Sequence, residues 1–363
     1  MDSFAFIIHP IDPKRDVSRK FPLLGKVLTE KQINFFSTFF PPVYISEISG
    51  IRSEATGKEV KGWFVACPYT PARMLELPEK TVYRKITQTG RMAEKLGAKI
   101  LGLGAFTSVV GDAGNTIANH LEIPVTTGDS YTVAIAVKAV IRAAAEMCIP
   151  VSNATAAVVG ATGAIGQVCA RLLADQVAEI YLVGRDRQKT EQVANQILAG
   201  HPRAKVIPTV DVNVLKQTQL ILSVTSDTDV IIRSEHLQPG CVVCDVSRPR
   251  DVAPEVAVNR PDILVIDGGV VDVPGPVNFN FDFGFPSGKA YACMAETIAL
   301  ALEGRFEDYT LGKSISLQQV EEIDTIAARH GFKLSGFRSF EKSISAEQIK
   351  RTWLHAQAAL QSS

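Results

Sequence analysis

Short apolar runs alternate with amphipathic stretches through the middle of the chain. The runs are rich in β-branched residues and predict buried strands at Ala156–Val159, Ile180–Val183, Lys205–Pro208, Leu220–Val224, Val242–Val246 and Ile263–Ile266. Strands that alternate with helices form βαβ units, whose strands pair in a parallel sheet. We therefore predict that residues 151–270 form a doubly wound α/β domain of the Rossmann type.

The first 150 residues mix shorter strands with two long helical patterns. Apolar runs predict strands at Phe4–Ile8, Trp63–Cys67 and Ala98–Leu103. Glu79–Leu96 has the periodicity of a helix, and Asp129 or Ser130 is placed to cap a second helix that runs through Met147. We expect this region, residues 1–150, to be an N-terminal α/β domain that binds the substrate.

Residues 271–363 are predicted to form a C-terminal helical segment. A loop rich in Pro, Gly and Phe at Val273–Gly288 leads into helices at Ala290–Leu302 and Gln318–His330. Near the end of the chain, one helix face carries an apolar stripe formed by Ile349, Trp353, Ala356 and Leu360. This stripe packs against the body of the protein or a second subunit, or it associates weakly with a membrane surface.

The composition is that of an ordinary globular protein. Of 363 residues 46% are apolar, and 38 basic side chains balance 38 acidic ones, so no basic field attracts nucleic acid. The chain opens without a signal-peptide pattern and has no apolar stretch as long as a membrane span. Cys241 and Cys244 have C-x-x-C spacing, but their apolar strand favours buried thiols over a metal or redox site. We expect a cytoplasmic protein without a metal.

A glycine-rich turn follows the first strand of the predicted sheet and opens a helix. Its spacing is G-x-x-G-x-x-G rather than the strict G-x-G-x-x-G of dinucleotide-binding domains. Glycines allow the backbone to approach a pyrophosphate closely, and the helix N-terminus favours the phosphate charge. The residues predicted to bind a dinucleotide here are Gly160, Thr162, Gly163, Ala164, Ile165 and Gly166.

The end of the second strand indicates which dinucleotide binds. An NAD-specific site has an acidic residue there, whereas this chain begins the turn with Gly184 and Arg185. Arg185 can pair with a 2′-phosphate with help from Arg187 and Lys189, although it could instead cover the adenine of either cofactor. Asp186 favours NAD. NADPH is the predicted cofactor. At the ends of later strands, the residues expected to border the nicotinamide are Ser223, Thr225, Gly268 and Gly269.

Cys293 is the cysteine whose position favours reactivity. It lies in the first turn of the helix after the Pro/Gly loop, where the helix dipole and nearby Lys289 would stabilise a thiolate. The local sequence by itself, however, favours a small buried residue on an apolar helix face.

Short segments along the chain resemble the long-chain acyl-[acyl carrier protein] reductases of cyanobacteria, which reduce acyl thioesters to fatty aldehydes with NADPH. In colinear order they are Arg15–Arg19, Ser53–Val60, Gly104–Ser108, Thr126–Ser130, Val158–Gly166, Gly268–Val271, Ala292–Glu296 and Arg329–Phe332. Glu54 interrupts the family's S-A-T-G-K segment, and Asp129 stands where the family's T-T-G-N-T has Asn. Residues 275–289 match only loosely, and the tail has no counterpart.

The resemblance implies that Cys293 takes up the acyl group from acyl carrier protein or coenzyme A and that hydride then releases the aldehyde. His330 is expected either to donate a proton to the collapsing oxyanion or only to end its helix, and Glu296 either to orient the site or to form a surface pair. Two loops are expected either to position the substrate or to be ordinary turns. Their candidate substrate-binding residues are Phe106, Thr107, Ser108, Thr127, Gly128 and Ser130.

Two other functions remain open from the sequence. The shikimate dehydrogenases and glutamyl-tRNA reductases share a Rossmann domain with an arginine after the second strand, but this chain lacks a matching catalytic segment in its first 130 residues. A redox sensor that binds NADPH without turnover would also have these glycines and a reactive Cys293.

Overall fold

The computed structural model describes residues 1–200, 205–227 and 229–361. The chain forms two compact units, each built from two separate stretches. Unit 1 comprises Met1–Tyr131 and Val271–Lys333, and unit 2 comprises Thr132–Val270 and Leu334–Ser363.

Unit 2 is built around a six-stranded sheet. Its strands are β6 (Thr155–Val159), β7 (Glu179–Val183), β8 (Lys205–Thr209), β9 (Leu220–Ser223), β10 (Val242–Asp245) and β11 (Leu264–Asp267). They lie in the order β11-β10-β9-β6-β7-β8, and all neighbours are parallel. This is the order of a doubly wound dinucleotide-binding sheet, so the predicted α/β fold class and its Rossmann sheet are confirmed.

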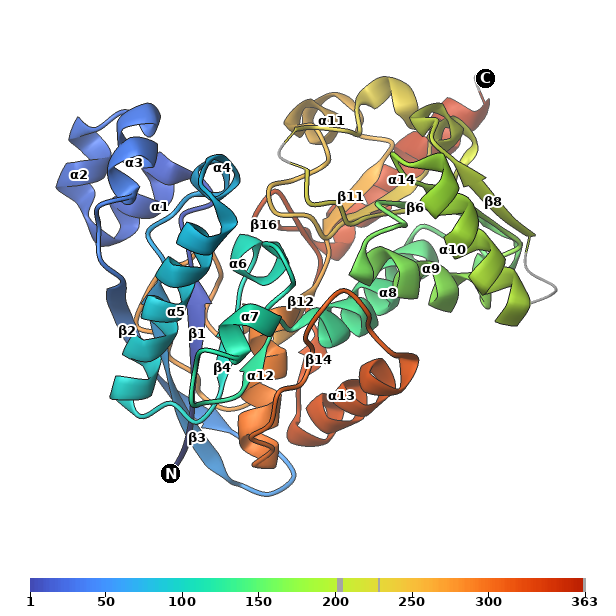
Figure 1. The fold of residues 1–363 in the computed structure, drawn as a ribbon. Helices are drawn as coiled ribbons and strands as arrows, with labels where there is room; N and C mark the ends of the chain where they lie inside the picture. The colour runs from blue at the N-terminus through green and yellow to red at the C-terminus, as the bar shows by residue number, and fades with distance from the viewer. Residues whose placement is uncertain (201–204, 228, 362–363) are drawn as a thin grey trace. The chain divides into compact units, whose positions relative to one another are not determined.

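The helices of unit 2 and its short 3₁₀ turns fill the connections (Figure 1). They are α8 (Asp129–Glu146, whose first turn belongs to unit 1), η1 (Val151–Asn153), α9 (Ala164–Ala174), α10 (Arg187–Gly200), η2 (Val212–Gln217), η3 (Ser234–His236), α11 (Pro254–Asn259) and α14 (Ala346–Gln361). Two short strands, β15 (Arg338–Ser339) and β16 (Lys342–Ser343), pair antiparallel. Cys241 and Cys244 are buried at β10, and burial raises the pKa of both thiols, which confirms that they are apolar core residues.

The apolar stripe near the end of the chain packs within unit 2. Ile349 and Ala356 of α14 are buried. Trp353 and Leu360 line a hollow together with the chain after α8 and the turn at Gly240. The structure therefore agrees with the packing interpretation of this helix.

Unit 1 contains a second sheet. Its strands are β1 (Asp2–Ile8), β2 (Val43–Arg52), β3 (Glu59–Ala66), β4 (Leu101–Leu103) and β5 (Val125–Thr126), in the order β2-β3-β1-β4-β5. Strands β3, β1, β4 and β5 are parallel, and β2 runs antiparallel at one edge. The carboxyl ends of the parallel strands therefore meet at one edge of the sheet.

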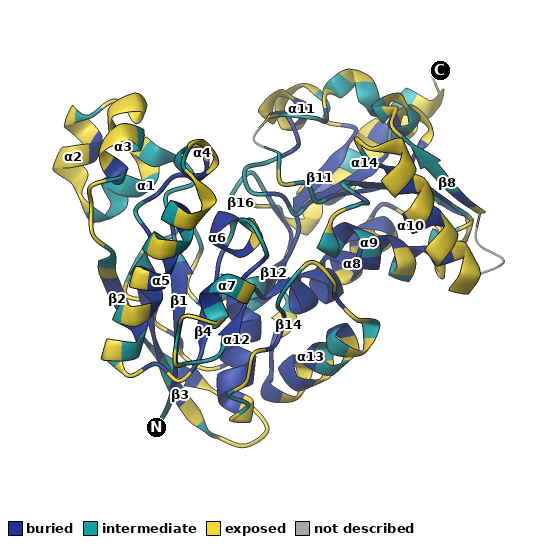
Figure 2. Ribbon diagram, viewed as in Figure 1, coloured by how far each residue is buried: buried dark blue, intermediate teal, exposed yellow. Residues whose placement is uncertain are grey.

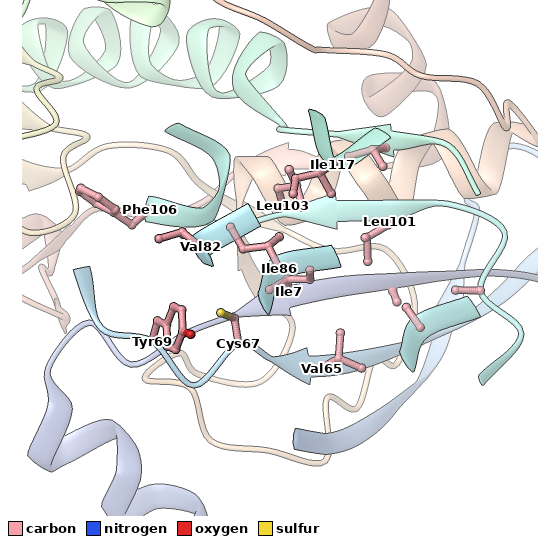
Figure 3. Packing of buried hydrophobic residues seen from close by; sticks show 14 of the residues in the cluster. Ile7, Val65, Cys67, Tyr69, Val82, Ile86, Leu101, Leu103, Phe106 and Ile117 are labelled. Atoms are coloured by element: carbon pink, nitrogen blue, oxygen red, sulfur yellow. The ribbon is translucent and has the colours of Figure 1, made fainter. Parts of the chain in front are cut away.

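The helices of unit 1 are α1 (Pro13–Lys20), α2 (Pro22–Val27), α3 (Glu30–Ser37), α4 (Pro71–Glu76), α5 (Glu79–Leu96), α6 (Phe106–Val109), α7 (Asn115–Ala118), α12 (Ala292–Glu303) and α13 (Leu317–His330). Helices α5 and α12 cover the two faces of this sheet. On one face, Val82 and Ile86 of α5 pack against Ile7, Leu101 and Leu103 of the strands (Figure 3). Helix α12 packs on the other face against β1, β3 and β4.

The division into units differs from the three consecutive regions expected from the sequence. The segment 271–333 belongs with the N-terminal residues because α12 covers their sheet. The tail belongs with the Rossmann sheet, since Ser335 N–H bonds to the carbonyl of Val270 and α14 is buried there. The chain crosses between the units near a three-stranded sheet of β13 (Lys289–Tyr291), β12 (Val270–Asp272) and β14 (Lys333–Leu334).

Candidate functional site

The glycine turn of unit 2 lies at the point where the strand order reverses. It follows β6, and the chain continues through β7 on one side while β9 pairs on the other. Gly160 has φ +86°, and a Cβ there would lie 2.5 Å from the carbonyl oxygen of Val224 after β9. A Cβ on Gly166 would overlap the carbonyl oxygen of Gly160. These two glycines are required by the packing of the turn itself.

Gly163 has a different reason to be glycine. It precedes the first residue of α9 with an ordinary negative φ, and a Cβ there would only reach 3.4 Å from the carbonyl oxygen of Gly160. No side chain caps α9, so the first-turn N–H groups at Ala164 and Ile165 are left to another acceptor. Space above a helix N-terminus with uncapped donors fits a pyrophosphate, so the residues present fit a dinucleotide.

Arg185 lies directly after β7 and is 88% exposed. Its guanidinium makes one ion pair, 3.2 Å from Asp227 Oδ2. An exposed pair contributes about 0–1 kcal/mol, so Arg185 can exchange Asp227 for a phosphate at little cost. Arg187, the exposed first residue of α10, lies two positions on. These cations fit the 2′-phosphate of NADPH, and that assignment stays a prediction.

Ser223 and Thr225 form hydrogen bonds to the buried carboxylate of Asp251, which the sequence did not point to. Their hydroxyls each donate to Asp251 at 2.6 Å, and the hydroxyl of Ser247 also donates to Asp251, at 2.5 Å. Asp251 lies in a loop without motif spacing, so no sequence signal points to it. The two hydroxyls are thus committed to holding the loops after β9 and β10, and their contact with a nicotinamide stays a prediction.

Gly268 and Gly269 follow β11, the edge strand of the same sheet. A Cβ on Gly268 would lie 2.6 Å from Val246 Cγ2, and Gly269 has φ +78°. Packing and backbone conformation therefore account for these glycines, and their place beside a nicotinamide is untested.

In unit 1, Cys293 is the second residue of α12 and is half-buried. The turn after β5 packs directly on it. Gly128 has φ +78°, and a Cβ there would overlap the Cα and Cβ atoms of Cys293. The structure thus brings together Gly128 and Cys293, two residues that the sequence analysis selected independently.

Glu296 is fully buried one turn after Cys293, so its interpretation as a surface pair is wrong. Its carboxylate accepts from the hydroxyl of Thr126 at 2.5 Å and from the N–H of Tyr131 at 2.8 Å. The hydroxyl of Thr310 lies 2.8 Å from the Glu296 carboxylate and 2.9 Å from the hydroxyl of Ser130. Glu296 therefore anchors the β5–α8 turn against α12, and its role in orienting the site stays a prediction.

The surroundings of Cys293 oppose the thiolate that its helix position favours. Burial first and then the nearby Asp129 carboxylate raise the pKa of the thiol to about 12, although the N–H of Met294 acts in the opposite direction. Burial and the neighbouring Glu296 raise the pKa of Asp129 itself to about 7. Lys289 bonds to Asp272 at 2.5 Å. At this thiol, burial and Asp129 outweigh the effect of the helix start, and Lys289 instead pairs with Asp272.

The loop after β4 is held by internal bonds. The hydroxyls of Thr107 and Ser108 donate to the carbonyls of Gly104 and Ala105 at 2.8 and 2.7 Å. The N–H of Phe106 donates to Nε2 of His9, whose pKa burial lowers to about 4, so His9 is neutral. His9 was missed, although a histidine directly after a strand was a visible signal. Thr127 is likewise bonded, to the carbonyl of Thr310. Substrate contacts of these loops stay predictions.

The proton-donor role of His330 is not supported by the structure. Its ring nitrogens lie 2.8 Å from the hydroxyl of Ser53 and 2.8 Å from the carboxylate of Glu303, and the side chain is buried. Glu303 ends α12 ten residues after Cys293, which corresponds to about 15 Å along the helix. His330 therefore ends α13 and ties it to the far end of α12.

The shikimate / quinate 5-dehydrogenase family model matches residues 142–267. The chain is 32% identical to aminotransferase PigE of Serratia sp., over 97% of this chain and 42% of that protein. It is 28% identical to the long-chain acyl-[acyl-carrier-protein] reductase of Synechococcus elongatus, over 91% of this chain and 98% of that protein. The chain is a homologue of both.

The chain spans 42% of the length of the Serratia protein, so the activity in that protein's name is that of a longer molecule. Among solved structures, L-tryptophan dehydrogenase from Nostoc punctiforme matches with a TM-score of 0.42 and 12% identity, over 100% of this chain and 89% of that chain. The dehydrogenase family match to the Rossmann sheet indicates an oxidoreductase that binds a nicotinamide cofactor.

Proposed function

We propose that this chain reduces an acyl thioester to an aldehyde with NADPH, through an acyl-enzyme on Cys293. The observation that carries the proposal is the setting of Cys293. It starts a helix, is half-buried, and lies against Gly128 at the carboxyl end of β5. The similarity to the Synechococcus reductase extends across 98% of that protein and supports the same reaction class.

In the first step, the Cys293 thiol loses its proton and its sulfur attacks the thioester carbonyl carbon. The bond to the carrier sulfur breaks, and the carrier leaves as a thiolate that takes up that proton. No side chain caps α12, so its first-turn N–H groups are placed to receive the developing oxyanion. Glu296 keeps Gly128 against Cys293 by holding the Thr126 and Tyr131 ends of the turn.

The cofactor site belongs to unit 2. Bound NADPH supplies the hydride that reduces the acyl group to the level of an aldehyde. Gly163 and the start of α9 would hold the pyrophosphate, and Arg185 would pair with the 2′-phosphate. When the thiohemiacetal on Cys293 collapses, the sulfur leaves as thiolate and the aldehyde is released.

The proposed substrate carrier is acyl carrier protein or coenzyme A, and the proposed acyl group is long and apolar. The printed name of the Synechococcus relative supports acyl carrier protein. A panel of thioesters with the two carriers and several chain lengths distinguishes these possibilities by kcat/KM.

The test of the proposed function is an intact-mass experiment. Protein mixed with an acyl thioester in the absence of NADPH should gain one acyl mass, which peptide mapping should place on residues 290–296. Addition of NADPH should remove the adduct and release aldehyde. A Cys293→Ala protein that still forms aldehyde at the wild-type rate would exclude the mechanism.

A dehydrogenase of the shikimate type is the second candidate, because that family model matches residues 142–267. It predicts NADP⁺-dependent oxidation of a small hydroxy acid with no acyl adduct. A protein that binds NADPH and alkylates at Cys293 but turns over neither substrate would be a redox sensor.

A further inference from the structure

Large apolar side chains gather on the surface of α1–α3 and the segment that follows them. Figure 2 shows α2 and α3 mostly exposed, whereas α1 is mostly intermediate. The exposed residues are Phe21, Leu23, Leu24, Val27, Phe35, Phe36, Phe39, Phe40 and Tyr44. Leu23, Val27 and Phe39 are each more than two-thirds exposed, at 78%, 76% and 71%. Scattered apolar side chains are common on protein surfaces, whereas a cluster of this extent marks an interaction surface. We call residues 13–44 the N-terminal helical surface.

The aromatic residues of this surface contact one another rather than a core. The ring centroid of Phe35 lies 5.4 Å from that of Phe36 and 5.8 Å from that of Phe39. All three rings remain exposed despite these contacts. Within α2 and α3, only Gly25, Ile33 and Ser37 are buried. The apolar side chains therefore do not serve the packing of unit 1.

The same segment is basic in a chain whose net charge is zero. Residues 13–44 contain six Lys or Arg and two Asp or Glu, a net charge of +4. Among the described residues, the ammonium groups of Lys14, Lys26 and Lys31 have no hydrogen-bond or ion-pair partner. All three side chains are exposed. Lys26 lies between Leu24 and Val27, so free positive charge and exposed apolar groups share one helix.

We propose that the N-terminal helical surface docks on a membrane that contains anionic lipids. Short helices with exposed Phe and Leu and flanking lysines bind in the interfacial layer of a bilayer, where rings enter the acyl boundary and ammonium groups meet phosphates. Along the described residues no helix is long and apolar enough to cross a bilayer, so the contact is peripheral. A two-fold contact with a second copy would bring two surfaces of net charge +4 together, which disfavours it.

This proposal is independent of the reaction at Cys293. It also places membrane association on a different segment from α14, the helix to which the sequence pattern pointed, because Ile349 and Ala356 of α14 are buried within unit 2.

The experiment measures co-sedimentation of the full chain with vesicles of phosphatidylcholine alone and of phosphatidylcholine mixed with phosphatidylglycerol. The test variant is Phe35→Ser with Phe39→Ser, and the control is Val258→Ser with Leu354→Ser, which removes two exposed apolar side chains from unit 2. A third variant, Lys26→Gln with Lys31→Gln, removes charge only. Thermal melting shows that each variant folds, since all these side chains are exposed.

Binding should occur to the anionic vesicles, weaken as salt is raised, and fall about tenfold in the Phe variant, which corresponds to about 1.4 kcal/mol. The Lys variant should lose the salt dependence in part, and the control should bind like wild type. In a Phe39→Trp variant, the tryptophan fluorescence should shift to shorter wavelength when anionic vesicles are added, because the ring leaves water.

Three results would overturn the proposal. The first is no sedimentation with anionic vesicles at low salt, and the second is equal binding by the Phe variant and the control. The third is a dimer that light scattering detects in the absence of lipid. In this case the Phe substitutions dissociate the dimer, and the wild-type protein does not bind vesicles. That result would assign the surface to a second copy.

Discussion

At Cys293 the helix N-terminus and the buried environment act in opposite directions. The helix start favours a thiolate by a few tenths to about 1 kcal/mol, whereas burial and the carboxylate of Asp129 raise the pKa of the thiol to about 12. Asp129 occupies the position at which the family's T-T-G-N-T segment has Asn. The charge at Asp129 therefore opposes the effect of the helix N-terminus on this thiol.

Replacement of Asp129 by Asn should make Cys293 more reactive near neutral pH. The wild-type carboxyl titrates at about 7 and opposes the thiolate once it is ionised. Alkylation of Cys293 by iodoacetamide at pH 8 should be several-fold faster in Asp129→Asn than in wild type, with the difference shrinking below pH 6. Peptide mass mapping isolates Cys293 from Cys148, the other accessible thiol among the described cysteines. An unchanged rate at pH 8 would show that Asp129 does not act on this sulfur.

The same variant has a consequence for stability. A carboxyl whose pKa is raised on folding, here from 3.8 to about 7, favours the folded state below its unfolded pKa. That stabilisation is lost as pH rises from about 4 to about 7. The melting temperature of Asp129→Asn relative to wild type should therefore increase over this window and level off above it.

Arg185 is the residue expected to distinguish NADPH from NADH. Arg185→Ala should weaken NADPH binding by about 1.5–3 kcal/mol, the range for a hydrogen bond to a charged group, and should leave NADH binding nearly unchanged. Titration calorimetry with both cofactors measures the difference. Lys205→Ala is the matched control, since Lys205 is also exposed and pairs with Glu179 at the opposite ends of β8 and β7 from the Arg185 turn. Equal losses for both cofactors would mean that Arg185 does not contact the 2′-phosphate.

At the scale of the element, the strand–turn–helix β6–α9 separates glycines that the fold needs from one that it does not. Gly160 and Gly166 have no room for a Cβ against the turn itself. Gly163 has room for a Cβ. A side chain at this position would therefore clash only with a ligand bound above the N-terminus of α9.

Gly163→Val should therefore abolish NADPH binding without unfolding the protein. The valine branches would occupy the space in which the pyrophosphate approaches the α9 N-terminus. Fluorescence titration with NADPH measures binding, and a cooperative melt near the wild-type temperature shows that the fold is intact. Gly166→Val serves as contrast, since it should lower the melting temperature by itself. Wild-type NADPH affinity in folded Gly163→Val would mean that this loop holds no cofactor.

At the scale of the whole molecule, the two chemical roles belong to different units. Cys293, Gly128 and Glu296 lie in unit 1, and the glycine turn and Arg185 lie in unit 2. If the proposed mechanism holds, acylation and reduction should be separable by substitution.

Gly163→Val should accumulate the acyl-enzyme that wild type discharges. With acyl thioester and NADPH both present, its intact mass should show one acyl group on Cys293, and aldehyde formation should be reduced at least about a hundredfold, because hydride transfer requires the bound cofactor. Cys293→Ser should show the converse, with normal NADPH binding and no adduct. If Gly163→Val forms no adduct although its fold is intact, the two steps do not divide between the units as proposed.

Patterns within short stretches of sequence were sufficient to predict the helices and strands and the parallel sheet of unit 2. The period of the apolar residues predicted the strands from β6 to β11, and Glu79–Leu96 matches α5 residue for residue. These features are local, because backbone conformation and the buried face of an element depend on residues a few positions apart. The same holds for the glycine turn, whose strand and helix are its immediate neighbours.

Contacts between distant residues were decided only in three dimensions. Three features depend on residues that are separated in the chain. Residues 271–333 join the N-terminal sheet, and Glu296 is buried against Thr126 and Thr310. His330 lies at the end of α12 that is far from Cys293. The pKa of Cys293 is of the same kind. Its helix position could be read from the sequence, but burial and the carboxylate of Asp129, 164 positions earlier, could not, because electrostatic effects follow distance in space and exclusion of water.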